Sequence, residues 1–288
     1  MGRSESRNQG ASMAWDLSLD LIQATVQVEQ ALPDGGRTVG TGFLIDAPTP
    51  DGRPRTVLVT AGHVLERMPK ASARIGYRVQ GGDGVWRYDP QTLTIRDTID
   101  HPAWAKHPTR DVAAIEVVAP PEFAKAAIPL AWLAADETFS KVALGPGDEM
   151  MALGFPRGLA ANGAGFPILR SGRVASYPLG PADNSPTFLL DFSVFPGNSG
   201  GPVFMAEAAR RRPGAGEAQE VQFVAGMLTQ QVELNKERLE IGVVTHAKFI
   251  RETVNMLDGV IPIRTSKVAE VLPATQVAAN AVEAGTID

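Results

Sequence analysis

The stretch "VFPGNSGGPVF", residues 194–204, places a serine among three glycines and between two prolines, inside sequence that is otherwise strand-like. A tight surface turn is one interpretation of this composition. The other is an exposed nucleophile, Ser199, whose neighbours are backbone alone because another group must come very close. Gly197 and Gly200 allow a sharp turn, since glycine adopts backbone conformations that other residues avoid. The N–H groups of Gly197 and Ser199 could then face one point, as an oxyanion hole requires.

A serine hydroxyl becomes a nucleophile only when a neighbouring base takes its proton and donors hold the oxyanion. Among the four histidines, His63 in "VLVTAGHVLE" stands at the end of a hydrophobic strand-like run, after small residues that leave room beside its ring. Asp111 in "TRDVAAIEVV" leads directly into another apolar run. A partly buried carboxylate in that position needs a partner. Asp100 is a spare carboxylate nearby, and we favour Asp111 as the partner of His63.

Three segments resemble, in this order, the signature segments of chymotrypsin-fold serine peptidases: "TAGHV", "DVAAI" and "GNSGGP". The closer likeness is to the bacterial trypsin-like and HtrA-type protease domains, which favour asparagine before the serine. Further segments resemble the supporting strands and turns of these domains: "GTGFLI", "HPAW", "GFPRG" and "IGVVTHAKFI". The likeness covers about residues 20 to 258.

The resemblance implies an all-β fold, with two six-stranded antiparallel β-barrels and a C-terminal α-helix. It implies a serine endopeptidase whose catalytic residues His63, Asp111 and Ser199 meet in the cleft between the barrels. His63 would move the proton, Asp111 would orient the imidazole, and the turn Gly197–Asn198–Ser199 would form the oxyanion hole. It implies no cofactor and no metal, and its partner would be a polypeptide substrate.

The primary specificity pocket is placed by the same resemblance. Ser193 would lie at its floor, and Thr229, Gln231 and Gly242 would contribute to its walls. A neutral floor offers no counter-ion to lysine or arginine. We therefore expect cleavage after apolar or small side chains.

Two features depart from the family patterns. Trypsin-like zymogens carry an aspartate before the nucleophile, which clamps a freshly cut N-terminus, whereas this chain has Asn198 and no "IVGG"-type start. Asn198 instead suggests a turn that side-chain hydrogen bonds hold. No PDZ-like module is apparent after Leu257, so the likeness to HtrA-type proteases ends at the catalytic unit.

Short strand-like runs fill most of the sequence, and several alternate apolar and polar residues with period two. The best helix candidate is Ala247–Leu257, where Phe249, Ile250, Thr253, Val254 and Leu257 form an amphipathic stripe. The expected organisation is a flexible arm, a first barrel, a connection, a second barrel, a helix and a tail: residues 1–14, 15–125, 126–147, 148–246, 247–258 and 259–288.

The composition limits the other function classes. The chain has 288 residues, 44% of them hydrophobic, a net charge of -5 and no cysteine. The absence of cysteine excludes a thiol nucleophile, a thiolate metal site and a disulfide. Mild acidity argues against nucleic acid as a partner. No apolar run approaches a membrane span and no signal-peptide core is apparent, so we expect a soluble cytoplasmic chain, or an exported one if a signal peptide was removed.

The same residues allow other interpretations. "GNSGG" also fits the nucleophile elbow of α/β-hydrolases, but strand-like sequence follows the serine where that fold needs a helix. A latent chymotrypsin-fold domain that binds peptides or regulates another protein is the main alternative to an enzyme. His101, His107 and His246 are expected in loops and at the surface, without metal-ligand spacing. "GGDGVW" at 81–86 is expected to be a hairpin turn rather than a calcium loop.

Overall fold

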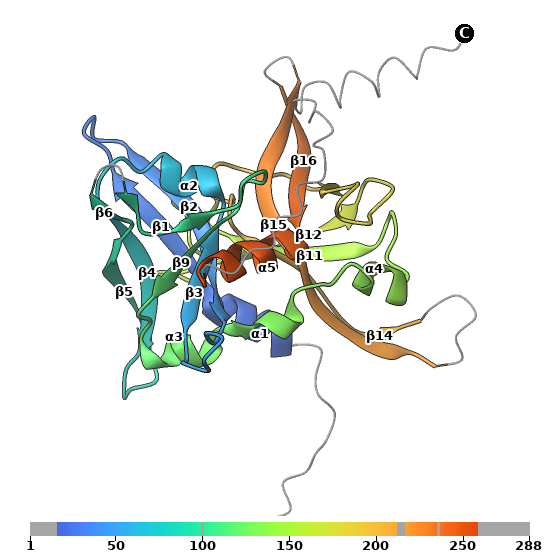
Figure 1. The fold of residues 1–288 in the computed structure, drawn as a ribbon, viewed down its shortest axis with the longest axis horizontal. Coiled ribbons are helices and arrows are strands. Elements are labelled where there is room, and N and C mark those ends of the chain that lie inside the picture. The colour runs from blue at the N-terminus through green and yellow to red at the C-terminus, as the bar shows by residue number, and fades with distance from the viewer. Residues whose placement is uncertain (1–15, 99–100, 212–216, 235–236, 259–288) are drawn as a thin grey trace, which may run out of the picture.

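The computed structural model describes residues 16–98, 101–211, 217–234 and 237–258. The predicted flexible arm at 1–14, the predicted tail at 259–288 and Asp100 lie outside the described residues. The strands of the described chain, nearly all of them antiparallel, gather in two units, one from each half of the sequence (Figure 1).

The first unit is an eight-stranded sheet in the order β5-β4-β1-β2-β3-β9-β8, with β10 paired in parallel to β2. Its strands are β1 (Thr25–Ala31), β2 (Arg37–Asp46), β3 (Thr56–Thr60), β4 (Ser72–Gln80), β5 (Trp86–Thr94), β8 (Ala105–Lys106), β9 (Ala113–Val117) and β10 (Ile128–Pro129). A separate ribbon joins β6 (Arg96–Thr98) and β7 (His101–Pro102). The strand count differs from the six expected because β8 and β10 are two residues long. Alternation of apolar residues cannot reveal strands so short.

The second unit is a closed barrel of six strands, as predicted, in the order β11-β12-β13-β16-β15-β14. The strands are β11 (Glu149–Gly154), β12 (Ile168–Val174), β13 (Thr187–Asp191), β14 (Pro202–Arg210), β15 (Gln219–Leu234) and β16 (Glu237–His246). Every neighbouring pair is antiparallel. The all-β class with two strand-built halves is therefore confirmed.

The helix α1 (Asp16–Ala24) precedes β1 and was not predicted. It forms because Leu17, Leu21 and Ala24 fall on one face at helical spacing, where all three are fully buried. α1 packs against α3 (Pro121–Ala126) and the Leu17 N–H donates to Gln222 Oε1 of β15 at 3.1 Å, so α1 contacts both units. The other short helices are α2 (Gly62–Glu66), η1 (Leu130–Trp132), α4 (Thr138–Lys141) and η2 (Pro156–Gly158).

The predicted C-terminal helix is present as α5 (Ala247–Met256). Its expected stripe is the buried face, with Phe249, Ile250, Thr253 and Val254 inside. α5 packs on β15 of the second barrel and on β9 of the first sheet, and it lies between the two units in Figure 1.

Two histidines expected at the surface are instead buried. His246 is 6% exposed, and its ring lies 5.1 and 5.2 Å from the ring centroids of Phe139 and Phe188. Burial lowers the pKa of His246 to about 4. His107 is also 6% exposed, and its Nε2 pairs with Glu252 of α5 at 3.0 Å. His101 is exposed on β7, as expected.

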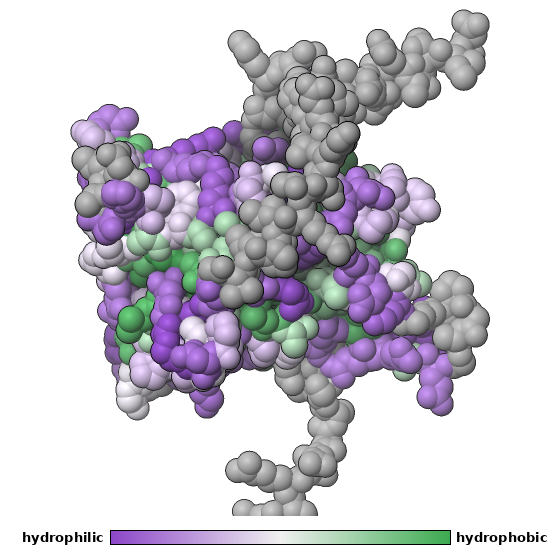
Figure 2. Space-filling model, in the orientation of Figure 1, coloured by the Kyte–Doolittle hydropathy of each residue, from purple (hydrophilic) through white to green (hydrophobic). Residues whose placement is uncertain are grey.

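Figure 2 shows hydrophilic residues over much of the visible face, with apolar areas scattered among them. Within the described ranges, no helix is long and apolar enough to cross a membrane. The segment at 81–85 is a turn between β4 and β5, where the Gly84 N–H donates to Gly81 O at 2.8 Å. The hairpin expected there is thus present.

Candidate active site

His63 and Asp111 meet at one end of the first sheet. β3 ends at Thr60 and α2 begins at Gly62, which places His63 on the first turn of α2. The His63 Nδ1 lies 2.6 Å from Asp111 Oδ2, and the His63 backbone N–H donates to Asp111 Oδ1 at 2.8 Å. One carboxylate therefore holds both the ring and the main chain of the histidine. The structure brings these two predicted residues together.

Gly62 makes this contact possible. A Cβ at Gly62 would lie 3.1 Å from Asp111 Oδ1 and 3.3 Å from Lys106 Cε. Burial alone would raise the pKa of Asp111, but the hydrogen bond and charge of His63, its backbone N–H and the charge of Lys106 outweigh burial. The pKa of Asp111 is held below its usual value, so the carboxylate stays ionised beside the imidazole.

Ser199 lies in the turn between β13 and β14. As expected, Gly197 and Gly200 have positive φ angles, +97° and +91°. Space also requires glycine here. A Cβ would lie 2.3 Å from Phe155 O at Gly197 and 1.9 Å from Thr41 O at Gly200. The glycines therefore let this turn pack directly against neighbouring backbone.

Thr41, in β2 of the first sheet, holds the serine turn through its backbone and side chain. Its N–H donates to Ser199 O at 2.9 Å, and its hydroxyl donates to Gly197 O at 2.6 Å. The same hydroxyl accepts the Phe155 N–H at 3.0 Å, and Thr60 Oγ1 donates to Thr41 O at 2.6 Å. These bonds hold the Ser199 turn beside the end of β3. The residues that follow β3 in the sequence carry His63.

The peptide between Pro196 and Gly197 has a defined direction. Its carbonyl accepts the Arg157 N–H at 2.6 Å. The C=O and N–H of a trans peptide point to opposite sides, so the Gly197 N–H points away from Arg157. Among the described residues, the N–H groups of Gly197 and Ser199 have no acceptor. Both remain available to a bound oxyanion.

The Ser199 hydroxyl is hydrogen-bonded to a backbone carbonyl of the second barrel. Ser199 Oγ donates to the carbonyl of Thr229, on β15, at 3.5 Å. In the described part of the chain, no hydrogen bond joins Ser199 Oγ to the His63 ring. The structure therefore shows His63 and Asp111 joined to each other, with Ser199 Oγ bonded to a backbone carbonyl.

Asn198 does not hold the turn in the way its side chain suggested. The residue is 3% exposed, and its Oδ1 is buried without a hydrogen-bond partner among the described residues. The turn is held instead by backbone bonds, from the Asn198 N–H to Phe195 O and from the Gly201 N–H to Asn198 O, both at 3.0 Å. Thr41 supplies the side-chain hydrogen bond that was expected of Asn198.

The predicted specificity residues are spread over three segments. Gly242 of β16 pairs with Gln231 of β15, and a Cβ at Gly242 would lie 2.8 Å from Val194 Cγ2, next to Ser193. Thr229 is buried and its hydroxyl contacts Thr245 Oγ1 at 3.2 Å. A Cβ at Gly242 would also lie 3.0 Å from Phe192 Cε1, so apolar side chains fill the space beside this glycine.

A cation lies beside the predicted pocket floor, which the sequence interpretation missed. Arg170 of β12 donates from Nη1 to Ser193 O at 2.6 Å. Its guanidinium carbon lies 5.5 Å from the ring centroid of Phe192 and 5.6 Å from that of Phe195. The predicted floor side chain is neutral, and the guanidinium of Arg170 is bonded to its backbone carbonyl. As for metals, no group of three or more suitable ligands is present in the described segments.

The sequence of residues 40–209, more than half of the chain, matches the family model of the trypsin-like peptidase domain. The chain belongs to the trypsin-like peptidase family. The match spans His63, Asp111 and Ser199, and it confirms the resemblance inferred from the three motifs. Among solved structures, this trypsin-like peptidase is similar to "HtrA-type protease AlgW with decapeptide", with 14% identity, a TM-score of 0.49 and coverage of 85% of this chain and 68% of that one. A comparison with curated proteins gives no match.

Three residues at the site of this trypsin-like peptidase were missed from sequence: Thr41, Arg157 and Arg170. The sequence could have pointed to Thr41, because a hydroxyl side chain between two glycines in a buried strand needs a nearby hydrogen-bond acceptor. Arg157 acts through its backbone N–H, and Arg170 reaches a carbonyl 23 positions away in sequence. The residues next to Arg157 and Arg170 in the sequence give no indication of either contact.

Proposed function

We propose that this protein is a serine endopeptidase in which His63, Asp111 and Ser199 act as one catalytic unit. The observation that carries the proposal is the 2.6 Å contact between His63 Nδ1 and Asp111 Oδ2. With Nδ1 donating to the carboxylate, Nε2 is left free to accept a proton, which is the form a general base requires. The family match supports peptidase activity at the coarser level.

In the first half of the reaction, Ser199 Oγ attacks the carbonyl carbon of the scissile peptide and His63 Nε2 takes the hydroxyl proton. Asp111 stabilises the imidazolium that forms. The oxyanion of the tetrahedral intermediate accepts hydrogen bonds from the Gly197 and Ser199 N–H groups. The C–N bond then breaks, and His63 returns the proton to the leaving amine.

In the second half, a water molecule attacks the acyl carbon of the Ser199 ester while His63 takes one of its protons. The second tetrahedral intermediate uses the same two N–H donors. Its collapse breaks the ester bond, His63 returns the proton to Ser199 Oγ, and the new carboxylic acid leaves. No cofactor enters the sequence.

The Gly197 N–H direction supports this proposal independently of the His63 contact. Removing one oxyanion-hole donor typically raises the activation barrier by about 2.7–4 kcal/mol. A turn that keeps both N–H groups free of other acceptors can therefore stabilise the transition state strongly. Rotation of Ser199 Oγ from Thr229 O toward His63 breaks only one long hydrogen bond, of 3.5 Å.

The test is hydrolysis of an unfolded polypeptide such as casein, read by mass spectrometry of the new termini. Wild-type protein should generate internal cleavages, and the Ser199→Ala variant should generate none. Matched far-ultraviolet circular dichroism of the two proteins excludes misfolding. Cleavage that persists at the wild-type rate in the folded Ser199→Ala variant would contradict the proposal.

A second candidate function is a latent peptide-binding module, and one observation favours it. The Ser199 hydroxyl is bonded to Thr229 O, with no hydrogen bond to the imidazole in the described part of the chain. Calorimetric titration with peptides separates the two functions. A latent module binds peptide with equal affinity in wild type and Ser199→Ala and returns it uncut, whereas an enzyme returns fragments.

A further inference from the structure

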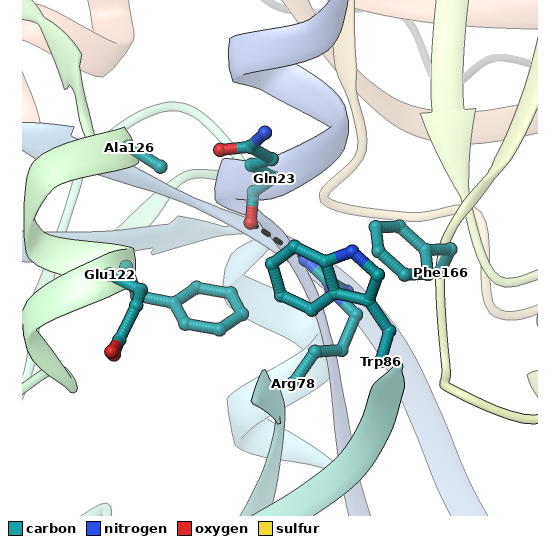
Figure 3. Close-up of a pocket in the computed structure, with 7 residues that line it drawn as sticks. Gln23, Arg78, Trp86, Glu122, Ala126 and Phe166 are labelled. Atoms are coloured by element: carbon teal, nitrogen blue, oxygen red, sulfur yellow. Dashed lines mark hydrogen bonds between the residues drawn. The ribbon is translucent and has the colours of Figure 1, made fainter. Parts of the chain in front are cut away.

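Arg78 of β4 is a buried cation at the junction of several segments. Its side chain is 1% exposed. One terminal nitrogen, Nη1, donates to Gly165 O at 2.9 Å. The other, Nη2, donates to the carbonyls of Ile22, Gln23 and Thr25 at 3.2, 2.6 and 2.9 Å. Figure 3 shows the guanidinium reaching Gln23 at the end of α1.

The guanidinium lies between two aromatic rings. Its central carbon lies 5.0 Å from the centroid of Phe123 in α3 and 4.7 Å from the centroid of Phe166. Within the described residues it forms no salt bridge. Burying an unpaired charge is costly, and here four carbonyls and two ring faces offset that cost. Burial lowers the pKa of Arg78 to about 10, so the side chain stays charged at neutral pH.

Gly165 and Phe166 belong to the loop that joins β11 to β12, residues 155–167. This loop belongs to the second barrel but lies against the first sheet. Besides Arg78, Gln27 Nε2 donates to Gly158 O at 3.1 Å, and the rings of Trp86 and Phe166 meet edge to face at 5.4 Å. Figure 3 shows Trp86, Arg78 and Phe166 side by side.

The beginning of the same loop holds the serine turn. The Arg157 N–H donates to Pro196 O at 2.6 Å, and the Phe155 N–H donates to Thr41 Oγ1 at 3.0 Å. The loop is closed on itself by the Ala161 N–H, which donates to Phe166 O at 2.8 Å. Arg78 thus fixes the loop at Gly165, near its C-terminal end. At its N-terminal end, the Arg157 N–H sets the direction of the peptide that carries the Gly197 N–H.

We propose that Arg78 is a positioning residue for the oxyanion turn, acting through the loop 155–167. This inference rests on the proposed peptidase function. Arginine suits the task because its fork of five donors reaches carbonyls on both sides while its faces stack on rings. Three of the four carbonyls come from the end of α1 and the start of β1, so Arg78 also makes the order of the loop depend on the docking of α1.

The test compares Arg78→Met with Arg55→Met in the full chain. Arg55 is the matched control because it is a buried arginine of the first unit, 5% exposed, and its hydrogen bonds within the described residues go to Ala47 O and Asp258 rather than to the loop. Arg78→Met should lower kcat about tenfold or more and leave KM unchanged, because oxyanion stabilisation is made in the transition state. Arg55→Met should lower thermal stability and leave kcat unchanged.

Hydrogen exchange supplies a readout that does not depend on activity. Arg78→Met should speed exchange of the Arg157 and Phe155 amides, and Arg55→Met should not. Three results in folded Arg78→Met protein would each overturn the proposal. They are a wild-type kcat, a change in KM alone, and Arg157 and Phe155 amides that stay protected from exchange.

Phe166→Ala serves if Arg78→Met does not fold, because it loosens the loop and leaves the buried cation in place. The same loss of kcat at constant KM is expected, and wild-type kcat would overturn the proposal. If wild-type protein cleaves nothing, the proposed function fails by itself. The exchange comparison still decides whether Arg78 orders the loop.

Discussion

The hydroxyl of Thr41 donates to the carbonyl of Gly197 at 2.6 Å, and this bond joins the first sheet to the turn before Ser199. The Phe155 N–H donates to the same hydroxyl at 3.0 Å. A single side chain of one unit therefore fixes two backbone segments of the other. The geometry of the candidate oxyanion hole depends on how the two units pack, as well as on the barrel that carries the serine.

Thr41→Val tests that dependence, since valine keeps the β-branch and loses the hydroxyl. The Gly197 carbonyl and the Phe155 N–H would both lose a buried partner, at about 1–3 kcal/mol of stability each. We expect kcat/KM to fall by about tenfold to a hundredfold with little change in KM, because the lost interaction positions a transition-state donor. Steady-state kinetics on a chromogenic peptide measures both constants.

Thr41→Ser is the control for that variant, because serine restores the hydroxyl. It should recover most of the lost kcat/KM. Wild-type kcat/KM in Thr41→Val would show that the hydrogen bond to Gly197 does not set the geometry of the turn.

Asp111→Asn is expected to lower kcat by about four orders of magnitude while the fold persists, because the amide no longer stabilises the imidazolium. Glu116→Gln is the matched control, since Glu116 is an exposed carboxylate on the adjoining strand β9, paired with Arg53. Its kcat should equal that of wild type. If kcat falls less than tenfold in Asp111→Asn, this carboxylate is not part of the catalytic unit.

Cleavage-site profiling of a peptide library tests the specificity assignment. Arg170 on the Ser193 carbonyl adds positive charge near the predicted pocket floor. We expect apolar or small residues before the cleaved bond, with lysine and arginine disfavoured by repulsion. Arg170→Met should weaken the discrimination against lysine several-fold. A dominant preference for lysine or arginine in wild type would refute the pocket assignment.

Acid should destabilise the protein through His246, whose pKa is lowered to about 4 by burial. Between pH 6.5 and 4 the unfolded chain binds a proton at this residue and the folded chain does not, so the free energy of unfolding falls as pH falls through this window. The loss is on the order of 3 kcal/mol. Denaturant titration of Ser199→Ala protein at several pH values measures it.

His246→Phe should flatten that pH dependence, because phenylalanine fits between Phe139 and Phe188 and does not titrate. If the free energy of unfolding of His246→Phe depends on pH as steeply as that of wild type, another group causes the acid sensitivity.

The parts of the fold that sequence could predict are those with a local pattern. The stripe of α5 appears in a few consecutive residues, and this helix formed where expected. His63 and Asp111 were predictable because each follows or precedes an apolar run within a known motif. Short elements such as β8 and β10 have no such pattern.

The parts that could not be predicted depend on contacts between distant segments. Arg78 looks like an ordinary strand arginine until α1, α3 and the loop 155–167 fold around it. His246 reads as a strand-end residue, and only the packing of Phe139 and Phe188 buries it. Asn198 was expected to hold its turn, but Thr41 occupies that role from the other unit.

Reaction with a fluorophosphonate probe tests the central claim most directly, because the probe forms a covalent bond only with a serine activated by its base. We expect stoichiometric labelling of wild-type protein at Ser199, no labelling of Ser199→Ala and labelling slowed at least about a hundredfold in His63→Ala. Intact-mass and peptide mass spectrometry give both the extent and the site. Folded wild-type protein that stays unlabelled, or that labels equally fast without the His63 imidazole, would contradict the account.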